Sequence, residues 1–350
     1  MLFRSRTLRV LSTTAAAALA VSLGAAAPAS AKSGPASGTS PVLVTSEVLA
    51  PLHLVPGPGG KSLYVADAFP GTVVRVDLHE RGATSTATVG TDLGFAPGVE
   101  VKGKRVYVVR TDEVGTGAEP EEQAPTYLSR VQRGGGPVDL VDLLGVERRL
   151  NPDGQRPDGD AESNPYDLVS YRGGFIVADA AGNSLIRVFA NGDAGVLTRL
   201  PLITAGPRCS VEENQGKIGC DPVPTGVALG RDGYLYVSGL GAFAAGQLWK
   251  IDPRTGRIVQ TLTTPTGNPP LTDVAVGDHG DLYVSSIVAG RVFRLSGGSW
   301  TSVALTAPAG LAFTRGTLYV GSAPAALLEG PPTGPPPPGG IYAVPSGAFS

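Results

Sequence analysis

Few residues of this chain can do chemistry, and the most informative ones recur at one position of a repeated pattern. The residue that opens an apolar strand in six similar stretches is His53, Gly98, Asp167, Gly226, Asp273 or Gly310. Three of the six therefore carry an imidazole or a carboxylate, and they alternate with glycine. Imidazole nitrogens and carboxylate oxygens bind calcium and other divalent cations. The sequence predicts a metal site wherever the fold brings His53, Asp167 and Asp273 together.

The same residues also allow a structural interpretation. Aspartate side chains accept hydrogen bonds from the backbone N–H groups of turns, so Asp167 and Asp273 would then be turn caps and His53 a space-filling side chain. Glu162, Asn164 and Tyr166 lie just before Asp167 and are further candidates for binding a ligand near the same place. Catalytic residues stay unknown, because the sequence contains no G-x-S-x-G, H-E-x-x-H or phosphate-binding glycine loop.

The elements that must position these residues follow from an internal repeat. Each unit has an apolar strand, a turn that contains glycine, and a second strand of the form x-Tyr-Val or close to it. The second strands are Leu63–Val65, Val106–Val108, Phe175–Val177, Leu235–Val237, Leu282–Val284 and Leu318–Val320. A third strand follows in every unit and a fourth in five of them. The repeat length is close to the ~40–50 residues of a propeller blade, once insertions at Asp112–Pro125, Arg148–Ser163 and Ile203–Pro222 are allowed for.

The ends of the repeat array predict how the ring closes. The sixth unit lacks a fourth strand, and an unassigned strand at Val42–Leu49 precedes the first unit. We therefore expect an all-β, six-bladed β-propeller over residues 41–350, in which the N-terminal strand completes the last blade. Closure of this kind pairs the strand edges that an open array would expose. The alternative is two separate β-domains divided near residue 155.

Residues 1–31 have the pattern of a secretory signal peptide. Arg4, Arg6 and Arg9 precede an apolar run, and Ala29-Ser30-Ala31 forms a small-residue cleavage site. The alternative, a membrane anchor, requires a longer apolar stretch, and no other segment approaches that length. Residues 32–40 are rich in Ser, Gly and Pro and are predicted to be a flexible leader. The mature chain is expected to be secreted.

Cysteine usage and charge add two expectations. Cys209 and Cys220 are the only cysteines, and in an exported chain they are predicted to form a disulfide. A reactive thiol pair would be expected to have the C-x-x-C spacing, which is absent. The formal net charge is −2, and residues 1–31 hold three basic residues but no acidic one, so the mature chain is modestly acidic. Nucleic acid is therefore not expected as a partner, because binding its phosphate backbone requires a basic face.

Four stretches resemble one known group of proteins. These are Ser163–Tyr166, Val177–Asn183, Val223–Ala228 and Asp232–Val237, with the sequences SNPY, VADAAGN, VPTGVA and DGYLYV. They resemble the ScyD/ScyE family of exported bacterial propellers, and the blade pattern is similar to NHL and TolB-like six-bladed propellers. The resemblance brings no established active site. Asp167 stands where the family pattern leads us to expect glycine after Asn-Pro-Tyr.

Two classes of function follow. The first is a non-enzymatic module that binds a small ligand or a protein at the mouth or rim of the propeller. The alternative is a metal-dependent hydrolase or lactonase of the six-bladed kind. Similar lactonases hold a central calcium with acidic and Asn side chains. Here the six equivalent positions that open the first strands hold one His, three Gly and two Asp. That departure favours binding over catalysis.

Overall fold

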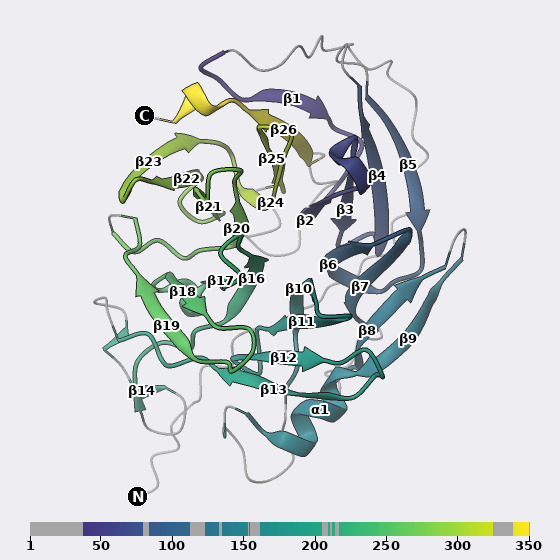
Figure 1. The fold of residues 1–350 in the computed structure, drawn as a ribbon, viewed down its shortest axis with the longest axis vertical. Helices are drawn as coiled ribbons and strands as arrows, with labels where there is room; N and C mark the ends of the chain where they lie inside the picture. The colour runs from purple at the N-terminus through teal and green to yellow at the C-terminus, as the bar shows by residue number, and fades with distance from the viewer. Residues whose placement is uncertain are drawn as a thin grey trace, which may run out of the picture.

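The computed structural model describes residues 38–79, 84–112, 123–132, 135–152, 154, 162–204, 209–210, 212–213, 217–265, 267–324 and 339–349. The predicted signal peptide, most of the predicted leader and most of the predicted insertion Asp112–Pro125 lie outside these residues. The strands form six four-stranded antiparallel sheets arranged as a ring (Figure 1), and one two-stranded sheet. The six-bladed β-propeller predicted from the repeat is confirmed.

Each four-stranded sheet is one blade, and in blades 1 to 5 the strands follow chain order from the centre of the ring outward. Blade 1 contains β2 (Pro51–Pro56), β3 (Ser62–Asp67), β4 (Thr72–Leu78) and β5 (Thr84–Gly90). Blade 2 contains β6 (Phe95–Lys102), β7 (Arg105–Thr111), β8 (Thr126–Val131) and β9 (Pro137–Asp142). Blade 3 contains β10 (Pro165–Tyr171), β11 (Gly174–Asp179), β12 (Ser184–Val188) and β13 (Ala194–Arg199).

The second half of the ring repeats the same order. Blade 4 contains β16 (Pro224–Leu229), β17 (Leu235–Gly239), β18 (Gln247–Ile251) and β19 (Ile258–Leu262). Blade 5 contains β20 (Asp273–Val276), β21 (Leu282–Ser286), β22 (Arg291–Ser296) and β23 (Ser299–Ala304). Blade 6 contains β24 (Pro308–Thr314), β25 (Thr317–Ser322), β26 (Gly340–Val344) and β1 (Val42–Thr45).

The ring closes as the sequence predicts. β1 pairs antiparallel with β26, with Val42 opposite Ala343 and Thr45 opposite Ile341. The N-terminal strand therefore supplies the outer edge of the last blade. It ends at Thr45 rather than at Leu49, because the carboxylate of Asp67 binds the backbone N–H groups of Leu49 and Ala50 and so turns the chain toward β2.

Apolar side chains hold neighbouring blades together. Each of the six blade interfaces has its own buried cluster, and those clusters include residues from the inner strands of both blades. The hairpins between the first and second strands have the predicted chemistry, since Gly233 and Gly280 adopt φ of 81° and 82°, a region that glycine enters without steric cost.

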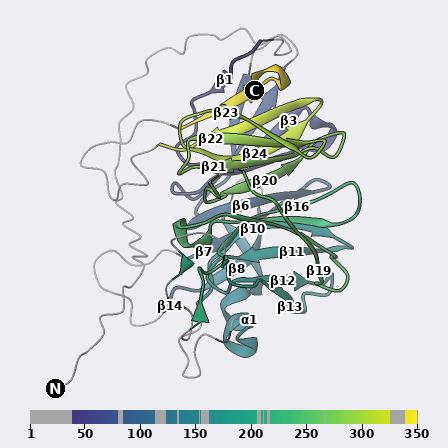
Figure 2. The same ribbon diagram turned by 90° about the vertical axis from the view of Figure 1, so that its left-hand side faces the viewer.

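The largest unpredicted element is a helix. α1 (Leu143–Leu150) follows β9 and lies at the outer edge of the ring (Figures 1 and 2). Asp142 caps its N-terminus by accepting a hydrogen bond from Gly145 N, and Asn151 ends it in the left-handed conformation. The remaining elements are a two-stranded hairpin, β14 (Glu212–Glu213) with β15 (Lys217–Ile218), and three 3₁₀ turns, η1 (Pro58–Gly60), η3 (Gly241–Phe243) and η5 (Ser346–Ala348). No helix among the described residues is long and apolar enough to cross a membrane.

Candidate functional site at the propeller axis

The inner strands of blades 1, 3 and 5 bring three polar side chains to the axis. His53 lies on β2, Asp167 on β10 and Asp273 on β20. One ligand atom from each, a ring nitrogen and two carboxylate oxygens, lies within 4.8 Å of the others. Their exposed fractions are 9%, 0% and 1%. We call these three residues the axial cluster.

His53 contacts the side chain of Asp167 and the backbone of Val99. Its Nε2 lies 3.0 Å from Oδ1 of Asp167. Its Nδ1 lies 3.1 Å from the carbonyl oxygen of Val99 and 3.4 Å from the backbone nitrogen of the same residue. The imidazole therefore joins the inner strand of blade 1 to those of blades 2 and 3.

The two aspartates use both carboxylate oxygens in the same way. Asp167 accepts a hydrogen bond from the next residue of its own strand, Leu168 N at 2.6 Å, and another from Val227 N of blade 4 at 2.7 Å. Asp273 accepts from Val274 N at 2.7 Å and from Leu311 N of blade 6 at 2.7 Å. Each carboxylate thus ties an odd-numbered blade to the even-numbered blade that follows it.

Glycine is required at the three alternate positions, because each lies against the backbone of the next inner strand. A Cβ added to Gly98 would lie 3.0 Å from the Cα of Asp167, one added to Gly226 would lie 2.8 Å from the Cα of Asp273, and one added to Gly310 would lie 2.7 Å from the Cα of His53. Any side chain there would push two inner strands apart. The alternation of polar residue and glycine is therefore a packing rule of the ring as well as a chemical pattern.

Burial dominates the electrostatics of the cluster. It lowers the pKa of His53 to about 4, against the opposing hydrogen bond with Val99. Burial raises the pKa of Asp167 to about 8, although two backbone N–H groups stabilise its charged form. Burial, and then the charge of Asp167, raise the pKa of Asp273 well above its ordinary value. At neutral pH the imidazole is uncharged, so it does not neutralise the carboxylates.

Glu100 is an acidic neighbour that the sequence did not single out. It lies on β6, two residues beyond Gly98, and its Oε1 accepts a hydrogen bond from Ser170 Oγ at 3.2 Å. Burial raises its pKa to about 7, and the charge of Asp167 acts in the same direction. The only signal in the sequence is its position, because the equivalent residues of the other inner strands are Val55, Val169, Ala228, Ala275 and Ala312.

The other predicted ligand-binding candidates divide into two groups. Tyr166 is partly buried, and burial together with the charge of Asp273 raises its pKa to about 12, so its hydroxyl lies in the field of the cluster. Asn164 is positioned through its backbone, because its N–H donates to Asp179 Oδ1 at 2.7 Å. Glu162 is exposed and is therefore not part of the buried cluster. His79 and His279 are exposed.

Apolar side chains surround the end of the axis at which the cluster lies. Seven side chains from five different blades pack together here. They are the buried Leu52, Ala68, Ala309 and Ala323 and the partly buried Phe95, Tyr166 and Ile287. On loops that join the second and third strands of blades 1, 4 and 5, the side chains of Phe69, Phe243 and Val288 are 51%, 51% and 52% exposed. We call this apolar end of the ring the mouth.

The predicted disulfide is present away from the axis. Cys209 and Cys220 are bonded, with their Cα atoms 4.8 Å apart. Both are buried in the cluster between blades 3 and 4, and Cys220 also pairs with Ile203 through two backbone hydrogen bonds of 2.9 Å. The bridge closes the segment that links these two blades.

The spacing of the axial cluster suits a calcium ion better than a zinc ion, whereas its imidazole nitrogen is a ligand typical of zinc. Oxygen ligands lie about 2.3–2.6 Å from calcium, so two ligands of one ion are at most about 5 Å apart. The 4.8 Å spread of the cluster meets that limit. Ligands of zinc lie about 2.0–2.2 Å away, which would require the three side chains to move closer together. Within the described part of the chain, no lysine or arginine makes an ion pair with either aspartate.

Comparison with known proteins identifies the class through the fold. No family model matches this chain, and no curated protein matches it in sequence. Regucalcin from Agrobacterium tumefaciens, described as a calcium-binding protein, has a TM-score of 0.55 and 11% identity, over 90% of this chain and 95% of its own. PQQ-bound aldose sugar dehydrogenase from Streptomyces coelicolor has a TM-score of 0.55 and 13% identity, over 89% and 99%.

A third similar structure is a luciferin-regenerating enzyme, with a TM-score of 0.58 and 14% identity, over 89% of this chain and 97% of its own. At these identities the likeness shows the fold alone. The chain is a six-bladed β-propeller.

Proposed function

We propose that this propeller binds a divalent cation, calcium in the first place, at His53, Asp167 and Asp273. The observation that carries the proposal is the meeting of three ligand atoms within 4.8 Å in a buried site. Two carboxylates at such a distance repel each other strongly in a medium of low dielectric constant. Either a shared proton or a bound cation removes that repulsion, and a cation also uses the nitrogen of neutral His53.

The bound cation would support hydrolysis of a small molecule, such as a lactone or an ester. Calcium takes about six to eight ligands, so the three protein atoms leave positions for water and substrate. A cation in such a site can polarise a carbonyl group. Tyr166 borders the cluster, and Glu100 with a pKa of about 7 is suited to accept a proton near neutral pH. Several proteins of similar fold are named as enzymes, which favours this class over a purely binding function.

A non-enzymatic binding module is the second candidate, and the mouth favours it. Phe69, Phe243 and Val288 are half exposed at the same end of the ring as the axial cluster. Exposed apolar side chains of this size mark binding surfaces when they gather around one site. Membership of the ScyD/ScyE family, as the resemblance implies, is compatible with either candidate.

The proposal also places the protein outside the cell. The disulfide between Cys209 and Cys220 supports this location, because such bonds persist in oxidising compartments. Protein recovered from the culture medium is expected to begin near Lys32. Mass spectrometry of that protein would contradict cleavage of a signal peptide if residues 1–31 were still attached.

Cation binding is tested by thermal unfolding and calorimetric titration of the chelator-treated protein. Calcium at one hundred times its Kd stabilises a binding protein by about 2.7 kcal/mol. The Asp167→Asn/Asp273→Asn double variant should lose that stabilisation. Asp67→Asn is the matched control, because Asp67 also accepts backbone N–H groups in a buried position but lies outside the cluster. Equal calcium stabilisation of wild type and double variant would overturn the proposal.

Catalysis is tested separately with a panel of lactones and esters, each assayed with calcium and with chelator. Calcium-dependent turnover that disappears in the double variant supports the hydrolase. Calcium binding without turnover of any panel member would favour the binding module instead.

A further inference from the structure

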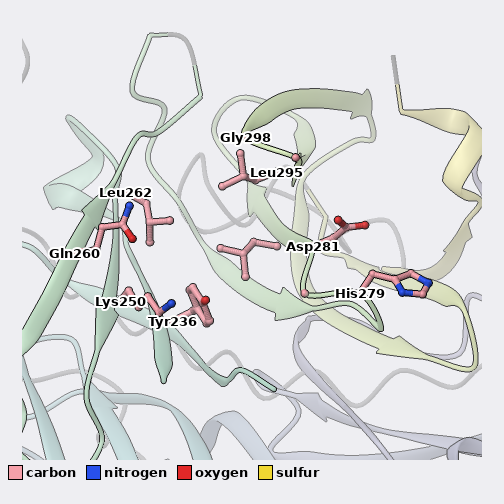
Figure 3. Close-up of a pocket in the computed structure, with 11 residues that line it drawn as sticks. Tyr236, Lys250, Gln260, Leu262, His279, Asp281, Leu295 and Gly298 are labelled. Atoms are coloured by element: carbon pink, nitrogen blue, oxygen red, sulfur yellow. The ribbon is translucent and has the colours of Figure 1, made fainter. Parts of the chain in front are cut away.

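A second candidate site lies between blades 4 and 5, at the opposite end of the ring from the axial cluster. A cavity of about 250 Å³ opens there, with Gln260, Lys250, Leu262 and Tyr236 on one side and Leu295, Gly298, Asp281 and His279 on the other (Figure 3). Asp273 begins strand β20, whereas His279 and Gly280 lie in the turn that follows the strand. The cavity is therefore separate from the axial cluster.

The cavity lies beside Tyr236, the tyrosine in the second strand of blade 4. The second strand of most blades carries a tyrosine that faces the next blade. At the interface of blades 2 and 3, Tyr107 packs against Phe175 with ring centroids 4.7 Å apart. At the interface of blades 5 and 6, Tyr283 stacks on Phe313 at 5.5 Å.

At the interface of blades 4 and 5, smaller aliphatic side chains face Tyr236. The residues equivalent to Phe175 and Phe313 are Leu282 and Val276, and both belong to the same apolar cluster as Tyr236. The turn beyond adds no bulk, because Gly297 and Gly298 have no side chain and only open space where a Cβ would stand. The cavity borders the tyrosine, and Lys250 Nζ lies over its ring, 5.6 Å from the centroid.

The charged groups around the cavity are already paired. Lys250 Nζ lies 2.7 Å from Asp232 Oδ2, and the hydroxyl of Tyr236 donates to the same oxygen at 2.8 Å. Across the cavity, Arg294 donates to Asp281 Oδ2 at 2.6 Å. Because each charge has a partner of opposite sign, the cavity does not require a charged ligand.

The uncharged polar groups suit a ligand that both donates and accepts hydrogen bonds. Gln260 is exposed, and its side chain offers an amide N–H₂ and an amide oxygen (Figure 3). His279 lies at the rim with its ring turned away from the side chains of blade 4. Leu262, Leu295 and the ring of Tyr236 supply an apolar wall between these groups.

We propose that this cavity binds a neutral, polyhydroxylated small molecule, a single monosaccharide unit. Hydroxyl groups pair with the amide of Gln260, and the C–H groups of a pyranose ring contact the smaller, apolar part of a mainly polar lining. The size agrees, since about 250 Å³ corresponds to roughly eight waters at ~30 Å³ each. The site does not depend on the axial cluster or on its cation.

The test uses the full mature protein in chelator, with the methyl glycosides of glucose, galactose and mannose as probes. Binding is followed by ligand-observed NMR and titration calorimetry. At least one neutral glycoside should bind, and the related glucuronate and glucosamine should bind at least about tenfold more weakly, since a charge would meet a paired ion of the same sign.

Two variants assign the binding to this cavity. Gln260→Ala should weaken binding about tenfold, as expected for the loss of one or two hydrogen bonds. Leu262→Trp should abolish binding by filling the space, and an unchanged melting temperature would show that it folds. Thr261→Ala is the control, because Thr261 precedes Leu262 on β19 and points to the other face of the strand. The proposal is overturned if no neutral glycoside binds, or if both variants bind as wild type does.

Discussion

Raising the pH from 6.5 to 8 in the absence of a cation should destabilise this protein. The carboxyl of Asp167 has a pKa of about 8 in the fold and an ordinary value of 3.8 when exposed. The folded state therefore binds more protons than the unfolded chain over this range. A group with a raised folded pKa contributes stability that is complete below the unfolded value and is lost as the pH rises through the folded value.

The window from pH 6.5 to 8 isolates this effect from the imidazole. The pKa of His53 is lowered to about 4, so its contribution is lost only as the pH falls below 6.5. Asp167 acts at nearly the full ~1.4 kcal/mol per pH unit at pH 6.5 and at half that slope at pH 8, its folded pKa. Over these 1.5 units the expected loss from Asp167 is about 1.6 kcal/mol. Asp273 and Glu100, whose pKa values burial also raises, add to this loss in the same direction.

The assay is urea or thermal unfolding in chelator at several pH values between 6.5 and 8. Wild type should lose about 2 kcal/mol or more, whereas Asp167→Asn should show a shallower slope. Excess calcium should reverse the trend, because the cation binds ionised carboxylates and its stabilisation grows with pH. A stability that stays constant or rises with pH in chelator would refute the idea that the cluster holds a proton near pH 7.

Three further outcomes test the fold around the site. Deletion of residues 38–50 should lower the free energy of unfolding by roughly 2 kcal/mol or more, because burial of Val48 alone contributes about that much. A melting temperature within a degree of that of the full chain would contradict closure of the ring by β1. Cys220→Ser should cost about 3 kcal/mol, as the entropy of a loop of this length implies; equal denaturation midpoints with and without reductant would count against it. Gly226→Ala should cost about 1–3 kcal/mol and weaken calcium binding, while Gly195→Ala, where a Cβ meets open space, should change neither quantity.

The repeat predicted the blades well because its signals are local. A glycine in the turn and a following second strand that carries a tyrosine, or Ile176 in blade 3, mark each hairpin independently of the rest of the chain. The third and fourth strands predicted to follow each hairpin are present, β4 (Thr72–Leu78) and β19 (Ile258–Leu262) among them. α1 was not predicted, because it lies outside the repeat, although Asp142 and Asn151 carry its capping signals.

The axial cluster was predictable only from the equivalent positions of the aligned repeats. Aligning the repeats showed that His53, Asp167 and Asp273 would meet, because equivalent residues of inner strands lie at equal depth around an axis. The partners of those side chains were not predictable, since Val99, Val227 and Leu311 contribute only backbone N–H or C=O groups, which leave no mark on residue type. Glu100 was missed because it occurs in a single blade, and an alignment of repeats shows what recurs.

The alternation of polar residues and glycine at the start of the six inner strands also affects how function can be tested. In blades 1, 3 and 5 the polar side chain makes a hydrogen bond with the backbone of the following blade. In blades 2, 4 and 6 the inner strand of the next blade packs closely against the glycine. The groups that would bind a cation are thus the groups that hold the inner strands together. Replacing one of them changes both properties, so a loss of activity alone could not separate a ligand from a structural residue. A cation effect on wild type that Asp67→Asn keeps and the double aspartate variant loses makes that separation, because both changes remove a buried backbone acceptor and only one removes a ligand.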